Sequence, residues 1–383
     1  MIDVLIVGQG VAGSILAYKL LRRKKEIRII DPLRASRVEK IVNRTLGQSP
    51  GNTQWLNRLA GLYPLYKSIS GNRPIMSRVI GGLITPVTGK RLLKTWMADE
   101  FIPYASHFYH NLEIALQASF FQEQPIVRIF ASAEQANEWS VKSVSPEYSA
   151  FIENDYSFTN RNLNAPHGLT VFRQGAVVNG ALMLEQFNTF FEEKKCLIRE
   201  PFRHSDLKVQ SDYIQWKNII ARRIIFCEGW KAIENPLFNL LPFMPSKGEL
   251  LVIQSKKLQL QEIINRGIFI RPLFRDYYLV GSTYNWNDLS LNPTSAARIE
   301  LQEKLDGLLK VPYKIVDHFA GIRPTVKNRR PFIGVHPQKK NVYIFNGLGT
   351  KGLLLAPYLA NHFCEYLYDG KELMPEVDIQ RFY

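Results

Sequence analysis

The stretch MIDVLIVGQGVAGSILAYKLLRRKKEIRIID, residues 1–31, decides the fold. It opens with a short apolar run, DVLIV at Asp3–Val7, followed by the turn sequence GQGVAG at Gly8–Gly13. Apolar side chains at helical spacing come next, and a second apolar run, Ile27–Ile30, leads to Asp31. A strand, a glycine turn, a helix, a second strand and an acid, in this order, are the context in which a G-x-G-x-x-G motif binds a dinucleotide.

Each residue of this motif has its own physical role. Gly8 allows the tight turn out of the strand, Gly10 lets the backbone approach a pyrophosphate, and Gly13 lets the helix pack close to the strand. The helix N-terminus supplies N–H groups and a partial positive charge for phosphates. Asp31 is placed to accept a hydrogen bond from a ribose hydroxyl, and its charge disfavours NADP. We therefore predict a dinucleotide site. The motif alone leaves FAD, NAD and a turn without ligand open.

Length and composition set the broad class. A chain of 383 residues with 46% hydrophobic and 22% charged residues is typical of a folded protein with two domains. No run of about 18 apolar residues occurs, so we expect no membrane span. The first residues already fit a strand pattern, so we expect no secretory signal, and the three cysteines are scattered. We therefore expect reduced thiols and a cytoplasmic location.

The net charge of +15 bears on the partners of the protein. One interpretation is a basic surface that attracts anionic substrates, and the other is a nucleic-acid partner. The positive residues are spread along the chain, and the clusters, such as Lys327–Arg330, are short. This distribution favours the first interpretation, and the second remains an alternative.

Several segments in the rest of the chain carry a family resemblance. Residues 319–334 and 342–357 resemble the closing signature of the D-amino-acid oxidase and glycine oxidase family, in which G-[LI]-R-P precedes P-x-I-G and an N-G-x-G-x-x-G turn leads into the last helix. Three further segments match in the same order. The five sequences are SRVIGGLITP (77–86), IFCEGW (225–230), PLFRDYYLVGST (272–283), FAGIRPTVKNRRPFIG (319–334) and VYIFNGLGTKGLLLAP (342–357).

The resemblance implies an FAD-dependent oxidoreductase of the α/β class. Its fold would be a Rossmann-like FAD-binding domain with an interleaved antiparallel-sheet substrate domain. We place the FAD-binding domain at 1–95, 168–234 and 320–383, and the substrate domain at 96–167 and 235–319. No cysteine lies between residues 312 and 363, so the thioether found in the sarcosine-oxidase branch is not expected and the FAD should be non-covalent.

The resemblance also implies site residues. Arg323, in the G-[LI]-R-P run, would grip a substrate carboxylate as a bidentate fork. Tyr284, with Trp286, is a candidate to line the substrate pocket. Helix N–H groups after the second glycine turn would face the flavin pyrimidine edge. Besides Gly8, Gly10, Gly13 and Asp31, the expected cofactor-binding residues are Ser77, Arg78, Gly82, Leu83, Gly229, Trp230, Gly349, Lys351, Gly352 and Leu353.

The implied reaction is oxidation of an amino acid or secondary amine at its C–N bond, with the Cα–H leaving as hydride to flavin N5. The electron acceptor would be oxygen or another molecule. Two departures from the family pattern matter here. Leu279 stands where the sarcosine-oxidase branch has a lysine close to flavin N5, so rapid use of oxygen is not assured. Residues 36–76 form an insertion, expected as a surface appendage near the flavin entrance, either a lid or a peripheral elaboration.

Other functions remain as alternatives. The chain also resembles the flavin half of the bifunctional enzyme that trims carboxymethylaminomethyl uridine at the tRNA wobble position, and the net charge favours this alternative. A flavin-binding protein without turnover is a third. His107 and His110 share a helical face, but no carboxylate or cysteine completes a ligand set, so we expect no metal site.

Overall fold

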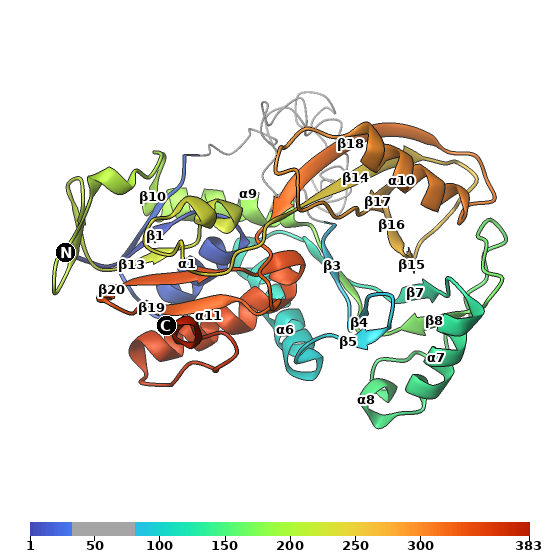
Figure 1. The fold of residues 1–383 in the computed structure, drawn as a ribbon, viewed down its shortest axis with the longest axis horizontal. Coiled ribbons are helices and arrows are strands. Elements are labelled where there is room, and N and C mark those ends of the chain that lie inside the picture. Colours follow the sequence, from blue (N-terminus) through green and yellow to red (C-terminus); the bar gives the residue numbers. More distant parts are fainter. Residues whose placement is uncertain (33–80) are drawn as a thin grey trace. The chain divides into compact units, whose positions relative to one another are not determined.

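The computed structural model of the chain describes residues 1–32 and 81–383 (Figure 1). The chain forms two compact units, which we call unit 1 (residues 1–36, 183–246 and 322–383) and unit 2 (residues 37–182 and 247–321). Both are mixed α/β, as expected from the sequence. The domain boundaries given above stay a prediction, and the insertion at 36–76 lies outside the described residues together with Ser77 and Arg78.

Unit 1 is built on a parallel sheet with the strand order β10-β2-β1-β13-β20. Because the neighbouring strands are parallel, their carboxyl ends meet at one edge, where an open α/β sheet binds its ligand. The strands are β1 (Ile2–Val7), β2 (Ile27–Ile30), β10 (Leu197–Ile198), β13 (Ile219–Phe226) and β20 (Lys339–Asn346). Both apolar runs of the opening sequence are thus buried strands, as predicted.

Strand β13 pairs with two partners along the same edge. Its residues 219–221 pair antiparallel with β12 (Ile214–Trp216), and its residues 224–226 pair parallel with β20. Antiparallel strands extend both partners, β11 (Leu207–Val209) beside β12 and β19 (Phe332–His336) beside β20. The long β13 therefore connects the parallel core to an outer hairpin.

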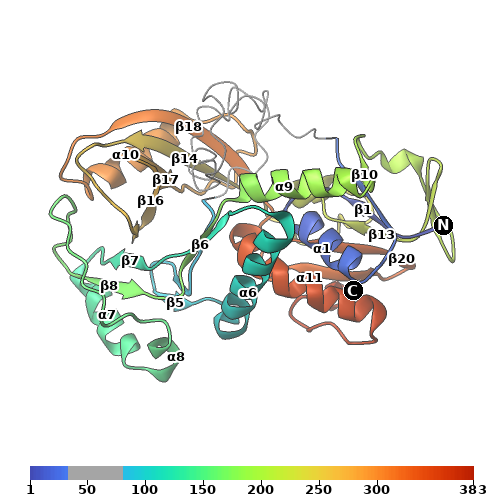
Figure 2. The same cartoon turned by 180° about the vertical axis from the view of Figure 1, so that it is seen from behind.

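Three helices pack together in unit 1: α1 (Val11–Arg22), α9 (Gly180–Glu193) and α11 (Gly352–Tyr368). Helix α1 lies between the other two (Figure 2). Tyr18 of α1 contacts Phe187 and Phe190 of α9, with ring centroids 5.9 Å apart in each pair. The apolar core of the sheet includes Trp216, Phe226, Phe238 and Phe332, all fully buried. This core joins the strands of the sheet to the segments around Phe238 and Ile379.

Unit 2 is built on a seven-stranded sheet with the order β18-β14-β17-β16-β15-β7-β8. Most of its pairings are antiparallel, and β15 with β7 is parallel. Helix α10 (Ser295–Asp306) packs on one face, where its Leu301 and Leu305 join the apolar core (Figure 1). The strands are β7 (Ile126–Ile129), β8 (Leu169–Phe172), β14 (Ser246–Gln254), β15 (Ile263–Arg266), β16 (Ile268–Phe274), β17 (Tyr277–Gly281) and β18 (Lys314–Arg323).

The remaining elements of unit 2 are small sheets and helices. Strands β3 (Leu83–Ile84), β9 (Ala176–Val178) and β6 (Phe121–Glu123) form one sheet, and β4 (Val87–Thr88) pairs with β5 (Leu93–Lys94). The helices are α6 (Ala98–Leu116), α7 (Ala133–Ser143) and α8 (Pro146–Ser149). Short 3-10 turns lie in unit 1: η1 (His204–Asp206), η2 (Gly229–Glu234), η3 (Gly349–Lys351) and η4 (Ile379–Phe382).

One expected helix has different bounds. The apolar pattern of residues 91–121 suggests one long helix with a break at Pro103, but α6 spans Ala98–Leu116 and continues through Pro103. Residues 93–94 form β5, and Met97 precedes the helix in the left-handed conformation, with φ of 48°. That backbone angle ends any helical pattern coming from the N-terminal side.

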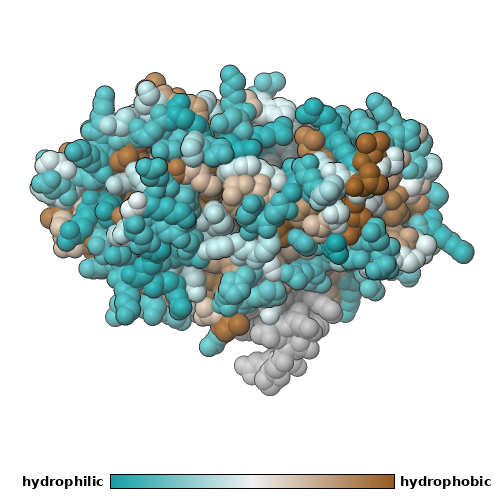
Figure 3. Space-filling view, turned by 90° about the horizontal axis from the view of Figure 1, so that it is seen from below, coloured by the Kyte–Doolittle hydropathy of each residue, from teal (hydrophilic) through white to brown (hydrophobic). Residues whose placement is uncertain are grey.

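Hydrophilic side chains predominate on the face of the molecule that Figure 3 shows. Among the helices of the described residues, none combines the length and the apolar character that a membrane span requires.

Candidate functional site

The first glycine turn, in unit 1, is shaped by two close backbone approaches. Gly8 has φ of +101°, and a Cβ placed there would lie 2.5 Å from the carbonyl oxygen of Cys227. A Cβ on Gly13 would lie 1.9 Å from the carbonyl oxygen of Gly8. Only glycine fits either position. The turn can therefore leave β1 sharply and start α1 directly, with Gly10 as the N-cap.

Asp31 holds the ends of β1 and β2 together. It is 8% exposed, and its Oδ2 accepts a hydrogen bond of 2.7 Å from the backbone N–H of Gln9, inside the glycine motif. The backbone N–H of Gly8 donates to the carbonyl of Ile30 at 2.9 Å. The acid expected to bind a ribose is thus fixed at the edge where the parallel strands end.

The second glycine turn of unit 1 lies beside the first. Gly349 has φ of +57°, and Gly352 begins α11. A Cβ on Gly352 would lie 3.9 Å from Cγ1 of Val11, at the start of α1. The Asn346 side chain donates to the carbonyl of Gly229 at 3.0 Å, which links the end of β20 to the turn after β13. Three expected cofactor segments, separated by hundreds of residues in sequence, therefore meet in one place.

Room for a ligand is present at this meeting point. Gly229 has φ of +62°, and a Cβ there would meet nothing within 4 Å in the described residues. Trp230 follows it in η2 and is half-buried. Leu353, in the first turn of α11, is 3% exposed and packs inward. The N-termini of α1 and α11, with their partial positive charge, flank this region.

Lys351 gives the second turn a titratable group. Burial, together with the nearby positive charges of Arg329 and Arg330, lowers the pKa of Lys351 to about 7. An ammonium group in this environment is stabilised by any anion that binds at the start of α11.

Arg323 ends β18 and is 7% exposed. The segment that follows it is tied to the second glycine turn, because the N–H of Gly349 donates to the carbonyl of Pro324 at 3.2 Å. The Thr325 hydroxyl lies 3.0 Å from the Ser246 hydroxyl. The structure therefore places Pro324, the residue after the expected carboxylate-binding arginine, against the second glycine turn.

The expected flavin loop of unit 2 is described from Gly81 onward. Gly82 has φ of +76°, and a Cβ there would lie 2.3 Å from the carbonyl oxygen of Val178. Leu83 starts β3. A Cβ on Gly81 would lie 2.6 Å from the Phe269 ring, so this loop packs on β16 of the large sheet. Its Gly-Gly sequence is therefore required by close packing on both sides.

Tyr284 and Trp286 lie in the loop after β17. They are 52% and 50% exposed, and their rings stack with centroids 5.9 Å apart and an interplanar angle of 23°. Both side chains were expected to line a pocket. In unit 2 they form an accessible aromatic pair, which can contact a ligand.

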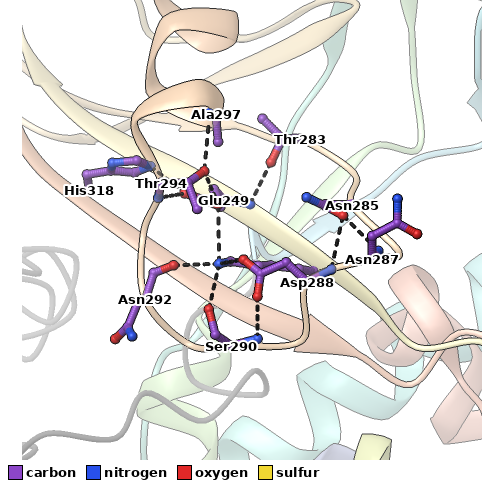
Figure 4. A network of polar contacts seen from close by, with 11 residues as sticks. Glu249, Thr283, Asn285, Asn287, Asp288, Ser290, Asn292, Thr294, Ala297 and His318 are labelled. Carbon is purple, nitrogen blue, oxygen red and sulfur yellow. Dashed lines mark hydrogen bonds and ion pairs between the residues drawn. The ribbon is translucent and has the colours of Figure 1, made fainter.

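A buried lysine anchors this loop, and the sequence analysis did not identify it. Lys247 of β14 is fully buried, and its Nζ donates to Asp288 at 2.5 Å, to Ser290 at 3.1 Å and to the carbonyl of Asn292 (Figure 4). The backbones of Lys247 and Asn285 exchange two further hydrogen bonds. Its signal in the sequence is a cation at the start of the apolar run of β14.

Glu249 continues the same network on β14. It accepts from the backbone N–H and the hydroxyl of Thr294 at 2.8 and 2.9 Å, and His318 Nε2 lies 2.8 Å away. Burial alone would raise the pKa of Glu249, but the hydrogen bonds from His318 and Thr294 and the charge of Lys247 outweigh it and lower the pKa. The loop from residue 283 to residue 294 is thus held at both ends.

Unit 2 also contains a cavity of about 790 Å³. Its lining includes His107, whose imidazole forms a hydrogen bond of 2.8 Å with the side chain of Asn111. It also includes His110, whose ring nitrogens lie 3.9 Å from carboxylate oxygens of Glu113 and Glu123. Besides these two histidines, its lining includes Ile102, Phe121, Tyr156 and Arg173. None of the expected cofactor or substrate residues is among the lining residues.

The geometry of unit 1 fits a dinucleotide of the FAD type. Two glycine turns start helices at one edge of the sheet, and close contacts exclude a side chain at Gly8 and Gly13 of the first turn. Asp31 lies at the end of β2, and a Cβ at Gly229 would meet nothing within 4 Å in the described residues. Backbone N–H groups at helix starts suit a pyrophosphate, and a carboxylate suits a ribose.

Comparison with known proteins agrees with this geometry. The model of the family "FAD dependent oxidoreductase" matches residues 3–366. Glycine oxidase of Bacillus subtilis is 30% identical over 118 residues, 30% of this chain and 32% of the relative. Glycine oxidase of Pseudomonas aeruginosa is 25% identical over 236 residues, 58% of this chain and 64% of the relative. The matches thus span less than two thirds of these relatives.

A further relative and a solved structure are also similar to this chain. The bifunctional protein MnmC of Idiomarina loihiensis, named for tRNA 5-methylaminomethyl-2-thiouridine biosynthesis, is 22% identical over 196 residues, 49% of this chain and 31% of the relative. The crystal structure of glycine oxidase from Bacillus cereus superposes with a TM-score of 0.73 at 16% identity, covering 97% of this chain and 96% of that one. At that identity the likeness shows the fold.

The family match covers nearly the whole chain, and the fold and both glycine turns agree with it. The expectations of an enzyme and of FAD as its cofactor are confirmed. The chain belongs to the family of FAD-dependent oxidoreductases that includes the glycine oxidases.

Proposed function

We propose that the enzyme oxidises the C–N bond of an amino acid or a secondary amine bearing a carboxylate. The observation that carries this proposal is the position of Arg323, buried at the end of β18 and followed by a segment bonded to the glycine turn at Gly349. A guanidinium matches a carboxylate in a bidentate, charge-assisted geometry. The substrate carboxylate would therefore bind Arg323.

The protein groups would orient the substrate. When bound, FAD would supply the redox chemistry of the reaction. Arg323 would fix the carboxylate and with it the Cα–H bond, and Tyr284 would limit the position of the substrate side chain. Holding the reacting bond in one orientation is the main contribution a protein makes to such a reaction. A substrate that binds as the neutral amine needs no protein base.

The residues proposed to hold FAD are those of the two glycine turns and their neighbours. Gly8, Gly10 and Gly13 would receive the pyrophosphate, and Asp31 the ribose. The start of α11 would face the flavin. The binding is proposed to be non-covalent. The proposed residues at the start of α11 are Gly349, Lys351, Gly352 and Leu353, and Gly229 and Trp230 are proposed beside them. Gly82 and Leu83 of unit 2 are also proposed to contact the cofactor.

The electron acceptor is proposed to be oxygen or a second redox partner. Leu279, 4% exposed on β17, offers no charge at the position that the resemblance associates with oxygen use. Mixing the reduced enzyme with oxygen and following the flavin absorbance measures this step directly. A slow reoxidation would assign the enzyme to the dehydrogenases.

Anaerobic reduction of the bound flavin by a panel of amino acids and N-alkylated amino acids tests the proposal. We expect bleaching of the flavin band by at least one of them. Arg323→Ala should lower the rate at limiting substrate roughly 100-fold, because a bidentate charge-assisted contact is lost. Arg298, exposed on α10, provides the control variant Arg298→Ala. If no amine bleaches the band, or Arg323→Ala behaves like the control, the proposal is wrong.

A tRNA substrate is the second candidate. The net charge of +15 and the similarity to the MnmC protein favour it. Such a substrate would also present a secondary amine with a carboxylate, so Arg323 would keep its role. Filter binding of tRNA across a salt series decides between the two, since phosphate contacts make affinity fall steeply with salt. Weak binding that is insensitive to salt would exclude this candidate.

A further inference from the structure

Strand β16 carries a charged side chain on an apolar sheet face. In its sequence IFIRPLF, Ile268 and Ile270 belong to the core beneath α10. Because successive side chains of a strand point to opposite faces, Phe269 and Arg271 lie on the other face. Phe269 packs there against an apolar cluster of Leu250, Val252, Leu279 and Phe319.

The strand register identifies the neighbours of Arg271 on this face. Arg271 pairs with Leu279 of β17, and Leu279 pairs with Val252 of β14. On the other side, the pairing of Ile270 with Ile264 sets Ile263 of β15 next to Arg271. Every cross-strand neighbour of this guanidinium is therefore aliphatic.

The adjacent row of the same face offers no acid either. It consists of Leu250, Gly281, Phe269, Asn265 and Arg128. Arg128 is bonded to neutral groups: its guanidinium donates to the side-chain oxygen of Asn265 and, at 3.2 Å, to the carbonyl of Gly89, while its Nε is buried without an acceptor. Arg128 therefore has structural partners.

Arg271 has none of these partners. Within the described residues it forms no ion pair and no side-chain hydrogen bond, and its Nε is buried without an acceptor. Burial lowers the pKa of Arg271 to about 10, so the side chain keeps its charge at neutral pH. The Arg271 side chain is half-buried. A charge that is partly removed from water without a counterion is costly, and a ligand carboxylate would supply the counterion.

The face that carries Arg271 also carries the contact with the expected flavin loop. Phe269, which touches Gly81, is two residues from Arg271 on the same strand and the same face. Two residues along a strand span about 7 Å. Arg271 therefore lies within the reach of a small molecule that binds beside this loop.

We propose that Arg271 binds a second acidic group of the substrate. The preferred substrates would then be amino acids or secondary amines with two carboxylates. This inference rests on the proposed function, in which Arg323 takes the carboxylate next to the amine. The planar guanidinium is suited to a carboxylate, which it can bind in a bidentate geometry.

Substrate selectivity of the full-length FAD-loaded enzyme tests this inference. The flavin is reduced anaerobically by iminodiacetate and aspartate, which carry two carboxylates, and by sarcosine and glycine, which carry one. For Arg271→Met, an apolar replacement of similar length, the ratio of two-acid to one-acid rates should fall roughly 30-fold. Arg271→Lys should restore part of the ratio, and Arg298→Met should leave it at the wild-type value.

A binding measurement separates this inference from the proposed function. Malonate and succinate have no amine to oxidise, and we expect them to perturb the flavin absorption spectrum of the wild type and not of Arg271→Met. If no amine reduces the flavin but the dicarboxylates bind through Arg271, the proposed reaction fails and the anion site stands.

Three results would overturn the inference. One is an equal loss for one-acid and two-acid substrates. Another is a variant whose only defect is in FAD affinity or in reoxidation by oxygen, which would assign Arg271 to the cofactor. The third is dicarboxylate binding that Arg271→Met leaves unchanged. Circular dichroism and FAD content, measured on both Arg271 variants, identify a folding defect. If Arg271→Met has such a defect, the substrate selectivity of Arg271→Lys decides whether the inference holds.

Discussion

At the scale of single residues, the fold changes the chemistry of groups that are ordinary elsewhere. Lys351 is the clearest case, because burial and two arginines bring its pKa to about 7. Gly13 is another, since a single methyl group there would overlap a carbonyl oxygen. For both residues the three-dimensional surroundings lead to a prediction that the neighbouring sequence alone does not give.

Lys351 should make FAD affinity depend on pH. Since the pKa is lowered to about 7 in the cofactor-free protein, an anionic cofactor nearby raises it, and binding above pH 7 takes up a proton. The FAD dissociation constant should therefore be flat below pH 7 and rise above it, by up to about tenfold per pH unit. Titration calorimetry in buffers of different ionisation enthalpy measures the proton uptake. In Lys351→Met the uptake should vanish.

Gly13→Ala should destabilise unit 1 and abolish FAD retention. The added Cβ would lie 1.9 Å from the Gly8 carbonyl oxygen, and overpacking of this kind costs about 3 kcal/mol. Gly307→Ala is the matched control, since its Cβ would meet nothing closer than 3.6 Å and its φ is −71°. We expect the control to change the free energy of unfolding by less than about 1 kcal/mol. Equal behaviour in denaturant titrations would contradict this account.

At the scale of elements, β14 and the loop after β17 act together. Lys247 and Glu249 reach from the strand to residues 288–294, so the position of Tyr284 and Trp286 depends on charges buried in the sheet. The two aromatic side chains are exposed, yet the loop that bears them is anchored beside the core.

Lys247→Met should release this loop. Losing the charge-assisted hydrogen bonds of Nζ should lower the free energy of unfolding by about 2 kcal/mol and change the fluorescence of Trp286. The Trp286 signal is the difference between each protein and its Trp286→Phe version. Lys256→Met, at an exposed position just after β14, is the control. An unchanged Trp286 signal would mean that the loop is held by its backbone bonds alone.

The same anchor should fail in acid. The hydrogen bond from Lys247 lowers the pKa of Asp288 to about 2, helped by the backbone and side chain of Ser290. Because the folded pKa lies below the unfolded one, the stabilisation is complete above about pH 4 and is lost as the pH falls toward 2. Trp286 fluorescence should follow that window. In Asp288→Asn this transition should be absent.

The elements that the sequence predicted well are those whose signal is local. The strand pattern at Ile27–Ile30 is an apolar run that ends at Asp31, and the apolar runs of β13 and β20 lead to Gly229 and Gly347. The helix α11 follows the glycines of the second turn. The bounds of α6 were wrong, because the left-handed conformation of Met97 interrupts a pattern that residue spacing alone continues.

Some residues of the candidate site could likewise be predicted from the sequence, and others could not. The glycine turns were predictable because their function requires a backbone conformation that glycine alone adopts. Lys247 was not, because its partners Asp288, Ser290 and Asn292 lie 41 to 45 residues away in sequence. Arg271 was missed for the related reason that its surroundings come from four different strands.

At the scale of the whole molecule, the cofactor site is assembled from distant parts of the chain. FAD should therefore slow amide hydrogen exchange in three separated segments at once: residues 8–14, 229–232 and 347–353. Exchange in the β11 and β12 hairpin, at the far edge of the same sheet, should not change locally. Hydrogen exchange with mass spectrometry compares the two states. Protection confined to the first segment would contradict the shared site.

The late position of β20 and α11 has a consequence for synthesis. The innermost parallel strand β1 is made first, but its neighbour β13 and the next strand β20 follow only after residues 219 and 339. A nascent chain on the ribosome therefore carries β1, α1 and β2 without β13 and β20 until the intervening segments, which include most of unit 2, have been synthesised. Cofactor capture must wait until about residue 353 has emerged, because the second glycine turn is made only then.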